Sequence, residues 1–395
     1  MNLRIFVTIL ILAITGVWGL FSPSDTIMKL ILPIIDLVSI LYFITNYKKI
    51  DSLFKKPLLI FLIFIIINIL GVYVLRGQSF ISSIRGIDML NFLSIYFLFI
   101  LHWIKLSSID ANKILKFLIW MFIGCYLIQW QLFPRQIFYI SGDGAMDSYI
   151  DSGNIRFRLQ AQGIAFLAFF YSIYKILQEK KWYNYLLLLL SLMIIIMFEF
   201  RSQLLILPFV VLLQLLYYRK YRKKKVVSIL FIMFLFCVIL MQTDFAGNKI
   251  QSMQNRSETQ NFNNDDYIRY FTFKYYTSTV PQNSYEKIMG TGLEGLDGEY
   301  QSYMLKGKMN GYIWADWGII GLTWVLGIPG VLCLIWYSVK AFKYSRSLPN
   351  EYYIGLWFLF LIIVGTFNRE FYRFGIFGIQ ALALYILDEK YKKIK

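Results

Sequence analysis

Apolar stretches of near membrane-spanning length alternate along the whole chain with connectors whose positive charge rises and falls at every second turn. Residues 57–75 (PLLIFLIFIIINILGVYVL) contain no charged side chain. At about 1.5 Å per residue they can cross a hydrocarbon core of about 30 Å as one helix. The other expected spans are residues 4–21, 27–45, 87–104, 114–133, 161–178, 183–200, 203–218, 226–242, 311–338, 351–367 and 371–387. With 58% hydrophobic residues, the sequence predicts an all-α polytopic membrane protein of about 12 transmembrane helices, folded as a single domain over residues 1–395.

The basic residues gather in the connectors on one side of this predicted topology. They gather at residues 48–56, 105–116, 175–181, 219–225, 340–346 and 390–395. The positive-inside rule makes that side cytoplasmic and places both termini there. The net charge of +17 is then largely a topology signal. We expect no nucleic-acid partner, because no base-reading or aromatic-stacking motif accompanies these clusters.

The residues that most often hold metals are scarce. The three cysteines, Cys125, Cys237 and Cys333, all fall inside expected spans and form no CxxC pair. The single histidine, His102, is expected to stand alone near the cytoplasmic end of the fourth span. We therefore expect no metal and no cofactor, and a Ser-His-Asp triad on the outer face is disfavoured.

Two connectors on the other side are long, whereas the cytoplasmic connectors are short. They are residues 134–160 and residues 243–310. Connectors of this length are usually functional or disordered. The second is rich in Tyr, Phe and Gly rather than in linker residues, which favours an ordered cap.

The outer side also carries arginines that the positive-inside bias should have removed. They are Arg76, Arg85, Arg135, Arg156, Arg158, Arg201, Arg256, Arg269, Arg369 and Arg373. Any single one could be a snorkelling side chain or an ion-pair partner. Together they suit a phosphate or diphosphate group, because the guanidinium fork binds phosphate oxygens in pairs and stays charged.

Four segments on this side carry a family resemblance. They are RLQAQGIAFLAF from Arg158, the turn FRSQLL with Arg201 and Ser202, the stretch from Arg269 to the Gly-x-Gly of Gly290 and Gly292, and MNGYIWADWGIIGL with Asn310 and Tyr312. In this order they resemble the bacterial O-antigen polymerase (Wzy) and O-antigen ligase superfamily. Met309 stands where the ligases have a histidine, which favours the polymerase over the ligase.

The resemblance implies a GT-C-like fold with two long periplasmic loops, in the bacterial inner membrane. It implies a metal-independent glycosyltransferase that joins undecaprenyl-diphosphate-linked oligosaccharide repeat units of O-antigen lipopolysaccharide, capsule or another surface polysaccharide, beside a flippase and a chain-length regulator. Its expected catalytic residues are Arg158, Arg201 and Arg269, with Asp316 or Glu294 as the general base. Its expected substrate-binding residues are Arg76, Arg85, Arg369, Asn310, Tyr312, Gly290 and Gly292.

Other interpretations stay open. Gly290 and Gly292 can equally form a turn that needs positive φ. The aromatic residues from Tyr267 to Tyr276 can be an interfacial helix or a platform for sugar rings. A lipid-linked oligosaccharide flippase explains the span number, although the sequence shows no clear internal repeat or pair of interrupted helices. A membrane O-acyltransferase would need a catalytic histidine, which an isolated His102 supports poorly.

Overall fold

The helices account for nearly all of the described structure. The computed structural model describes residues 3–15, 25–85, 87–133, 135, 137–138, 149–151, 154–156, 159–179, 181–198, 200–218, 227, 229, 268–293, 295, 297 and 299–394. Its N-terminal helices are α1 (Leu3–Ile14), α2 (Asp25–Thr45), α3 (Lys55–Arg76), α4 (Phe80–Arg85), α5 (Ile87–Leu93), η2 (Ser94–Tyr96), α6 (Phe97–Ile104) and α7 (Ser108–Leu132).

The second half continues the pattern. A two-stranded antiparallel hairpin, β1 (Tyr149–Asp151) and β2 (Asn154–Arg156), pairs Ile150 with Ile155. Then follow α8 (Ile164–Gln178), α9 (Trp182–Met197), the helix Arg201–Tyr218, α12 (Ile268–Lys274), the π-helix η4 (Tyr275–Thr279), α13 (Ser284–Met289), α14 (Glu299–Met309), η5 (Trp314–Trp317), α15 (Gly318–Ser345), α16 (Tyr352–Gly365), η6 (Arg369–Phe371) and α17 (Ile376–Lys392).

Four of the described helices are long and apolar enough to cross a membrane: Lys55–Arg76, Ser108–Leu132, Arg201–Tyr218 and Trp314–Ser345. Shorter apolar helices cover Arg4–Ile14, Ile31–Thr45, Met89–Ile104, Ile164–Gln178, Trp182–Met197 and Tyr352–Gly365. The chain is a helical membrane protein. The expected spans are mostly helical where they are described, although those at 311–338 and 371–387 begin with non-helical residues; the span at 226–242 lies almost wholly outside the described residues.

Two expected spans are displaced along the chain, and the one expected at 371–387 is observed as α17, Ile376–Lys392. The sequence predicts a helix over 311–338, whereas α15 runs from Gly318 to Ser345. Its start is delayed because Gly318 takes φ +56° directly after the short helix η5. This turn lets the chain change direction before the long helix begins.

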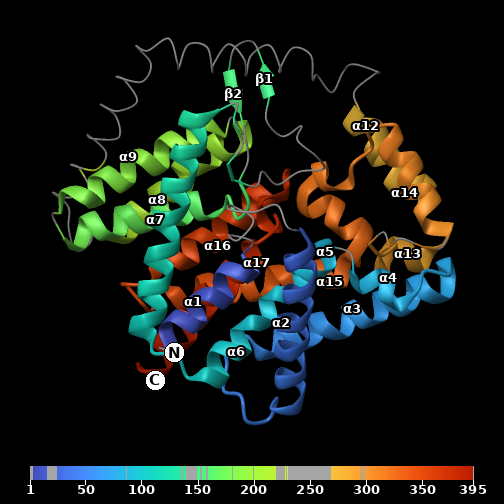
Figure 1. Ribbon diagram of the computed structural model, residues 1–395, viewed down its shortest axis with the longest axis horizontal. Coiled ribbons are helices and arrows are strands. Elements are labelled where there is room, and N and C mark those ends of the chain that lie inside the picture. The colour runs from blue at the N-terminus through green and yellow to red at the C-terminus, as the bar shows by residue number, and fades with distance from the viewer. Residues whose placement is uncertain are drawn as a thin grey trace.

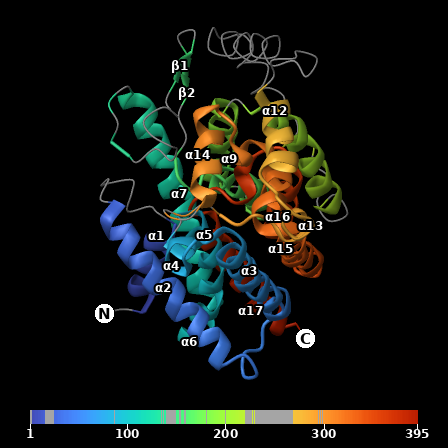
Figure 2. The same cartoon turned by 90° about the vertical axis from the view of Figure 1, so that its right-hand side faces the viewer.

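The core is built around α17, whose residues from Ile376 to Asp388 are all buried. It packs on α6 and α7, while α15 packs on α16 and α3, and α8 packs on α9 and α16. Figure 1 shows α7, α8 and α9 on one side of the molecule and α12, α13 and α14 on the opposite side. Figure 2 shows α13 beside α15, in agreement with their packing. The long connector at residues 243–310, called the outer connector from its expected side, thus contains ordered helices in its described part.

Candidate active site at the junction of η5 and η6

Two short helices, η5 and η6, meet beside the start of α15. The hydroxyl of Tyr372 donates to the carbonyls of Ala315 and Gly318, both at 3.1 Å. A Cβ at Gly318 would lie 2.2 Å from the carbonyl oxygen of Gly365, so only glycine allows this contact. The turns that carry Asp316 and Arg369 are therefore neighbours.

The start of α12 joins the same junction. The indole Nε1 of Trp317 donates to the backbone carbonyl of Arg269 at 3.1 Å. The ring of Phe273 lies 5.2 Å from the ring of Trp317. These contacts place Arg269, from the outer connector, next to the turn that holds Asp316.

The fourth contribution comes from the helix Arg201–Tyr218. The side-chain amide of Asn368 donates to the hydroxyl of Ser202 at 3.3 Å. The same amide caps η6 by accepting the backbone N–H of Glu370 at 3.0 Å. The serine-arginine turn is thus linked to the residue that precedes Arg369.

Three arginines and one carboxylate therefore come from segments far apart in the sequence. Arg201 and Asp316 are exposed, and Arg269 and Arg369 are half-buried. Together these four side chains carry a net positive charge, and their guanidinium groups remain charged at any physiological pH. Such a site favours an anion rich in oxygen acceptors, such as a phosphate or diphosphate.

The structure does not describe the side chains of three expected site residues. Arg158 and Glu294 are outside the described residues, and only the backbone of Arg85 is described. The turn after Arg158 does reach the junction. The backbone N–H of Ala161 donates to the carbonyl of Phe374 at 3.0 Å.

A buried ion pair that the sequence analysis missed supports η6. Arg373 donates to Oε1 of Glu370 through Nε at 3.1 Å and Nη2 at 2.8 Å. The side chains are 3% and 0% exposed, and Gln162 donates to the same oxygen at 3.3 Å. In the sequence, the only indication of this pair was that Glu370 and Arg373 have opposite charges and stand three residues apart. Arg373 is therefore bound by protein groups at the base of the junction.

Arg76 was expected to bind substrate, and the structure gives it a protein partner. Its Nε and Nη2 lie 2.5 and 2.7 Å from the two carboxylate oxygens of Glu286. Nη2 also donates to the carbonyl of Val280 at 2.5 Å. The two charged side chains are only 1% and 3% exposed. This pair fixes the end of α3 to α13, apart from the junction.

The two glycines of the Gly-x-Gly turn adopt backbone conformations and close contacts that favour glycine. Gly290 has φ +83° and Gly292 has φ +82°, which side chains with a Cβ rarely adopt. A Cβ at Gly292 would lie 2.1 Å from Cγ2 of Val72, and a Cβ at Gly290 would lie 2.4 Å from the backbone nitrogen of Gly327. The turn interpretation of these glycines agrees with this geometry.

Asn310 and Tyr312 lie at the end of α14. The side chain of Asn310 is exposed and donates to the carbonyl of Lys306 at 2.8 Å. The carbonyl of Tyr312 accepts a hydrogen bond from the hydroxyl of Tyr276 at 3.2 Å. The ring of Tyr312 stacks on the ring of Phe271, with the centroids 6.4 Å apart. Both residues help to fold the outer connector.

Aromatic side chains join this connector to α15. The ring of Tyr276 stacks on Trp324 at 5.4 Å with an interplanar angle of 4°. Tyr270 and Phe271 on α12 keep 54% and 37% of their surface exposed. Burial and two neighbouring tyrosines raise the pKa of Tyr275, whose hydroxyl donates to the carbonyl of Tyr303. The inner part of the cluster is packing, and its outer part is an accessible aromatic surface.

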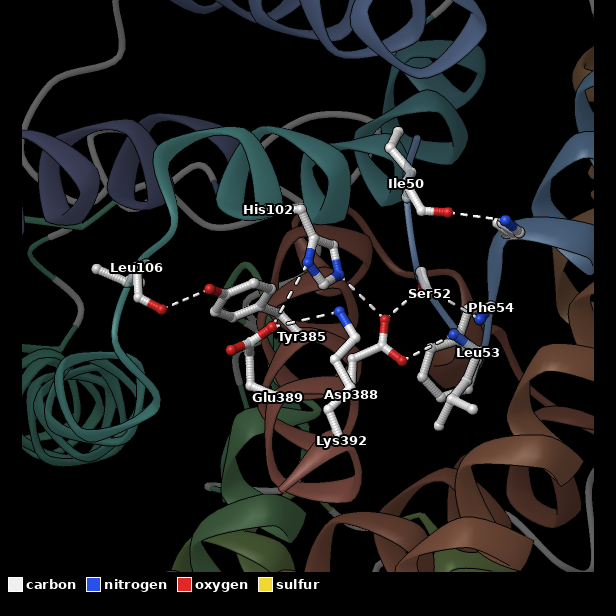
Figure 3. A network of polar contacts seen from close by, with 11 residues as sticks. Ile50, Ser52, Leu53, Phe54, His102, Leu106, Tyr385, Asp388, Glu389 and Lys392 are labelled. Atoms are coloured by element: carbon white, nitrogen blue, oxygen red, sulfur yellow. Dashed lines mark hydrogen bonds and ion pairs between the residues drawn. The ribbon is translucent and has the colours of Figure 1, made fainter. Parts of the chain in front are cut away.

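The single histidine is not isolated, which corrects the sequence expectation. Nε2 of His102 lies 3.0 Å from Asp388, and Nδ1 lies 3.7 Å from Glu389 (Figure 3). Asp388 is fully buried and also accepts the N–H of Leu53 at 2.8 Å and the hydroxyl of Ser52. Because the serine donates to the carboxylate rather than to the imidazole, these groups do not form a nucleophile and base. The cluster ties α6 and the α2–α3 connector to α17.

Within the part of the chain that is described, no group of three His, Cys, Asp or Glu residues could hold a metal ion. The chain matches no family model, no curated protein and no solved structure. Its function must therefore be argued from the junction itself and from the sequence patterns that converge on it.

Proposed function

We propose that this chain is a multi-pass glycosyltransferase of the O-antigen polymerase type, with about 12 spans, cytoplasmic termini and a GT-C-like fold in a bacterial inner membrane. The observation that carries the proposal is that the turns which carry Arg201, Arg269, Arg369 and Asp316 meet at one junction. Three of the four resembling segments contribute to it. The substrate is an oligosaccharide repeat unit on undecaprenyl diphosphate.

The reaction transfers a glycan from one lipid carrier to a second repeat unit. A hydroxyl oxygen of the acceptor sugar forms a bond to the anomeric carbon of the donor. The bond from that carbon to the diphosphate oxygen breaks, and its electron pair leaves with the polyprenyl diphosphate. Negative charge grows on the leaving group, so arginines directed at it lower the barrier selectively.

The proton of the acceptor hydroxyl needs a base. Asp316 is an exposed carboxylate at the junction and is our candidate for this role. Guanidinium groups supply the positive charge that other glycosyltransferases take from a metal ion. The exposed rings of Tyr270 and Phe271 would contact the glycan beside the reaction centre.

Gene deletion followed by gel separation of the surface glycan tests the assignment. Loss of the long ladder with a single repeat unit still displayed supports a polymerase. Polymer that accumulates on its lipid carrier without transfer indicates the ligase alternative. An unchanged ladder refutes the proposal.

A single substitution tests the junction. Arg269→Ala should abolish chain extension while the protein stays in the membrane at normal level. Arg135→Ala is the matched control, because Arg135 is also an exposed arginine of the outer side and has no described contact with the junction. Normal polymer from Arg269→Ala would remove Arg269 from the mechanism.

One observation favours the flippase as a second candidate. Helix α15 is interrupted at Gly327, where φ is +78° and ψ is +161°. Interrupted helices are common at transporter binding sites. Loss of every repeat unit from the surface after gene deletion would support this alternative.

A further inference from the structure

The interruption of α15 has a clear cause in the sequence Gly327-Ile328-Pro329. Gly327 leaves the helical region, and Pro329 has no N–H to donate to the carbonyl of Val325, four residues earlier. A backbone carbonyl without a partner at membrane depth costs several kcal/mol. The structure must therefore supply outside donors at this point.

The outer connector supplies them. The backbone N–H of Gly292 donates to the carbonyl of Val325 at 2.9 Å. The backbone N–H of Thr291 donates to the carbonyl of Trp324 at 2.8 Å, and its hydroxyl donates there at 3.1 Å. The Gly-x-Gly turn is thus inserted into the break of α15.

A side chain from α3 closes the joint. The side-chain amide of Asn68 donates to the carbonyl of Val325 at 3.0 Å and to the carbonyl of Met289 at 2.9 Å. Asn68 is 3% exposed. One amide therefore binds the interrupted helix and the inserted turn together.

Contacts along α3 measure how far the connector descends. The backbone carbonyl of Val280 accepts from Arg76 at the end of α3, whereas the carbonyl of Met289 accepts from Asn68, eight residues earlier on α3. At about 1.5 Å per residue, these two anchoring residues of α3 lie about 12 Å apart along its axis.

The chain then returns to its starting level. The carbonyl of Leu293 and the N–H of Gly295 both bond to the side chain of Gln78, beyond the end of α3. The backbone N–H of Ser79 bonds to Asp297, and hydrogen bonds from Ser79 and Ser82 lower the pKa of that carboxyl.

We infer that residues 285–293 form a re-entrant hairpin, which enters the membrane from the outer side and is locked into the break of α15. The hairpin does not depend on the proposed glycosyltransferase activity. It divides the second outer connector into two limbs, one carrying α12 with Arg269 and the other carrying α14. The tip between them is fixed, so the connector cannot open as one lid.

Thiol accessibility tests the hairpin in a variant in which Cys125, Cys237 and Cys333 are replaced. Ile288 on α13 and Leu305 on α14 are 52% and 50% exposed, so neighbouring side chains cover them equally. Burial by protein therefore predicts no difference between the two thiols. With a membrane-impermeant maleimide added to spheroplasts, Ile288→Cys should react at least about tenfold more slowly than Leu305→Cys, because its thiol faces lipid. Both should react fully in SDS, which shows that each thiol is present.

Equal labelling rates at the two positions would overturn the hairpin. Tyr285→Cys, at 39% exposed, gives a second position and should be protected like Ile288→Cys. Adding Asn68→Leu removes both amide donors and should raise the labelling rate of Ile288→Cys toward that of Leu305→Cys. An unchanged rate would refute Asn68 as the anchor of the tip.

Discussion

Breaking the buried pair of Arg76 and Glu286 should destabilise the protein strongly, and removing both charges should cost less than the sum of the two single losses. Arg76→Met leaves a carboxylate that is 3% exposed without its cation. Removing one member of a buried ion pair costs about 3–5 kcal/mol. Glu286→Leu should cost a similar amount, because it leaves the guanidinium buried among protein groups.

The double variant removes both buried charges. It still leaves two backbone groups without these partners: the N–H of Gln282, which donates to Glu286 at 2.6 Å, and the carbonyl of Val280, which accepts from Arg76 at 2.5 Å. Each loss is worth about 1–3 kcal/mol, so the double variant should lose about 2–6 kcal/mol, less than the sum of about 6–10 kcal/mol for the two single variants. Unfolding in mixed micelles with increasing SDS, followed by fluorescence of the ten tryptophans, measures these free energies.

Additive losses would show that the two side chains do not interact in the folded protein and would refute the reasoning. The same variants separate structure from substrate binding. If Arg76 only fixes α3 to α13, the double variant should keep polymer synthesis in spite of its reduced stability. A folded double variant without polymer would return Arg76 to the substrate site.

Three further predictions concern local geometry. Gly292→Ala should destabilise the protein by at least about 2 kcal/mol, because the added Cβ meets Val72 and the backbone has a positive φ. Gly124→Ala in α7 has open space around it and should be neutral or stabilising by up to about 1 kcal/mol. Equal Tm shifts in the two variants would contradict this prediction. His102→Leu should lower stability by about 1–3 kcal/mol, because it takes a donor from the buried carboxylate of Asp388, and an unchanged SDS midpoint would exclude this role. Tyr372→Phe should weaken the contact between η6 and η5 and lower Tm, while Tyr270→Phe on exposed α12 should leave Tm unchanged.

Much of the helical order follows from sequence because long apolar runs leave few alternatives. The run from Pro57 to Leu75 has no charged residue, and α3 covers it completely. The delayed start of α15 was not predictable from hydropathy, because it depends on how Gly318 packs against Gly365. Apolar patterns report which residues avoid water but not where a chain turns.

For the candidate site, too, the sequence predicted some features and missed others. The arginines of the expected outer side stood out because they oppose the charge bias, and the segments that carry Arg201, Arg269 and Arg369 meet at one junction. Arg76 carried the same signal, but its guanidinium is paired with Glu286, 210 residues away. Pairing between distant charges depends on tertiary packing, which no local pattern encodes.

The interruption of α15 also constrains how this chain is assembled in the bilayer. The turn at Thr291 and Gly292 is synthesised before Trp324 and Val325, and neither partner can satisfy its backbone alone. An α15 released into lipid without the turn would carry an exposed carbonyl, at a cost of several kcal/mol. Docking of the turn removes that cost, so we expect the two segments to pair before α15 is fully exposed to lipid.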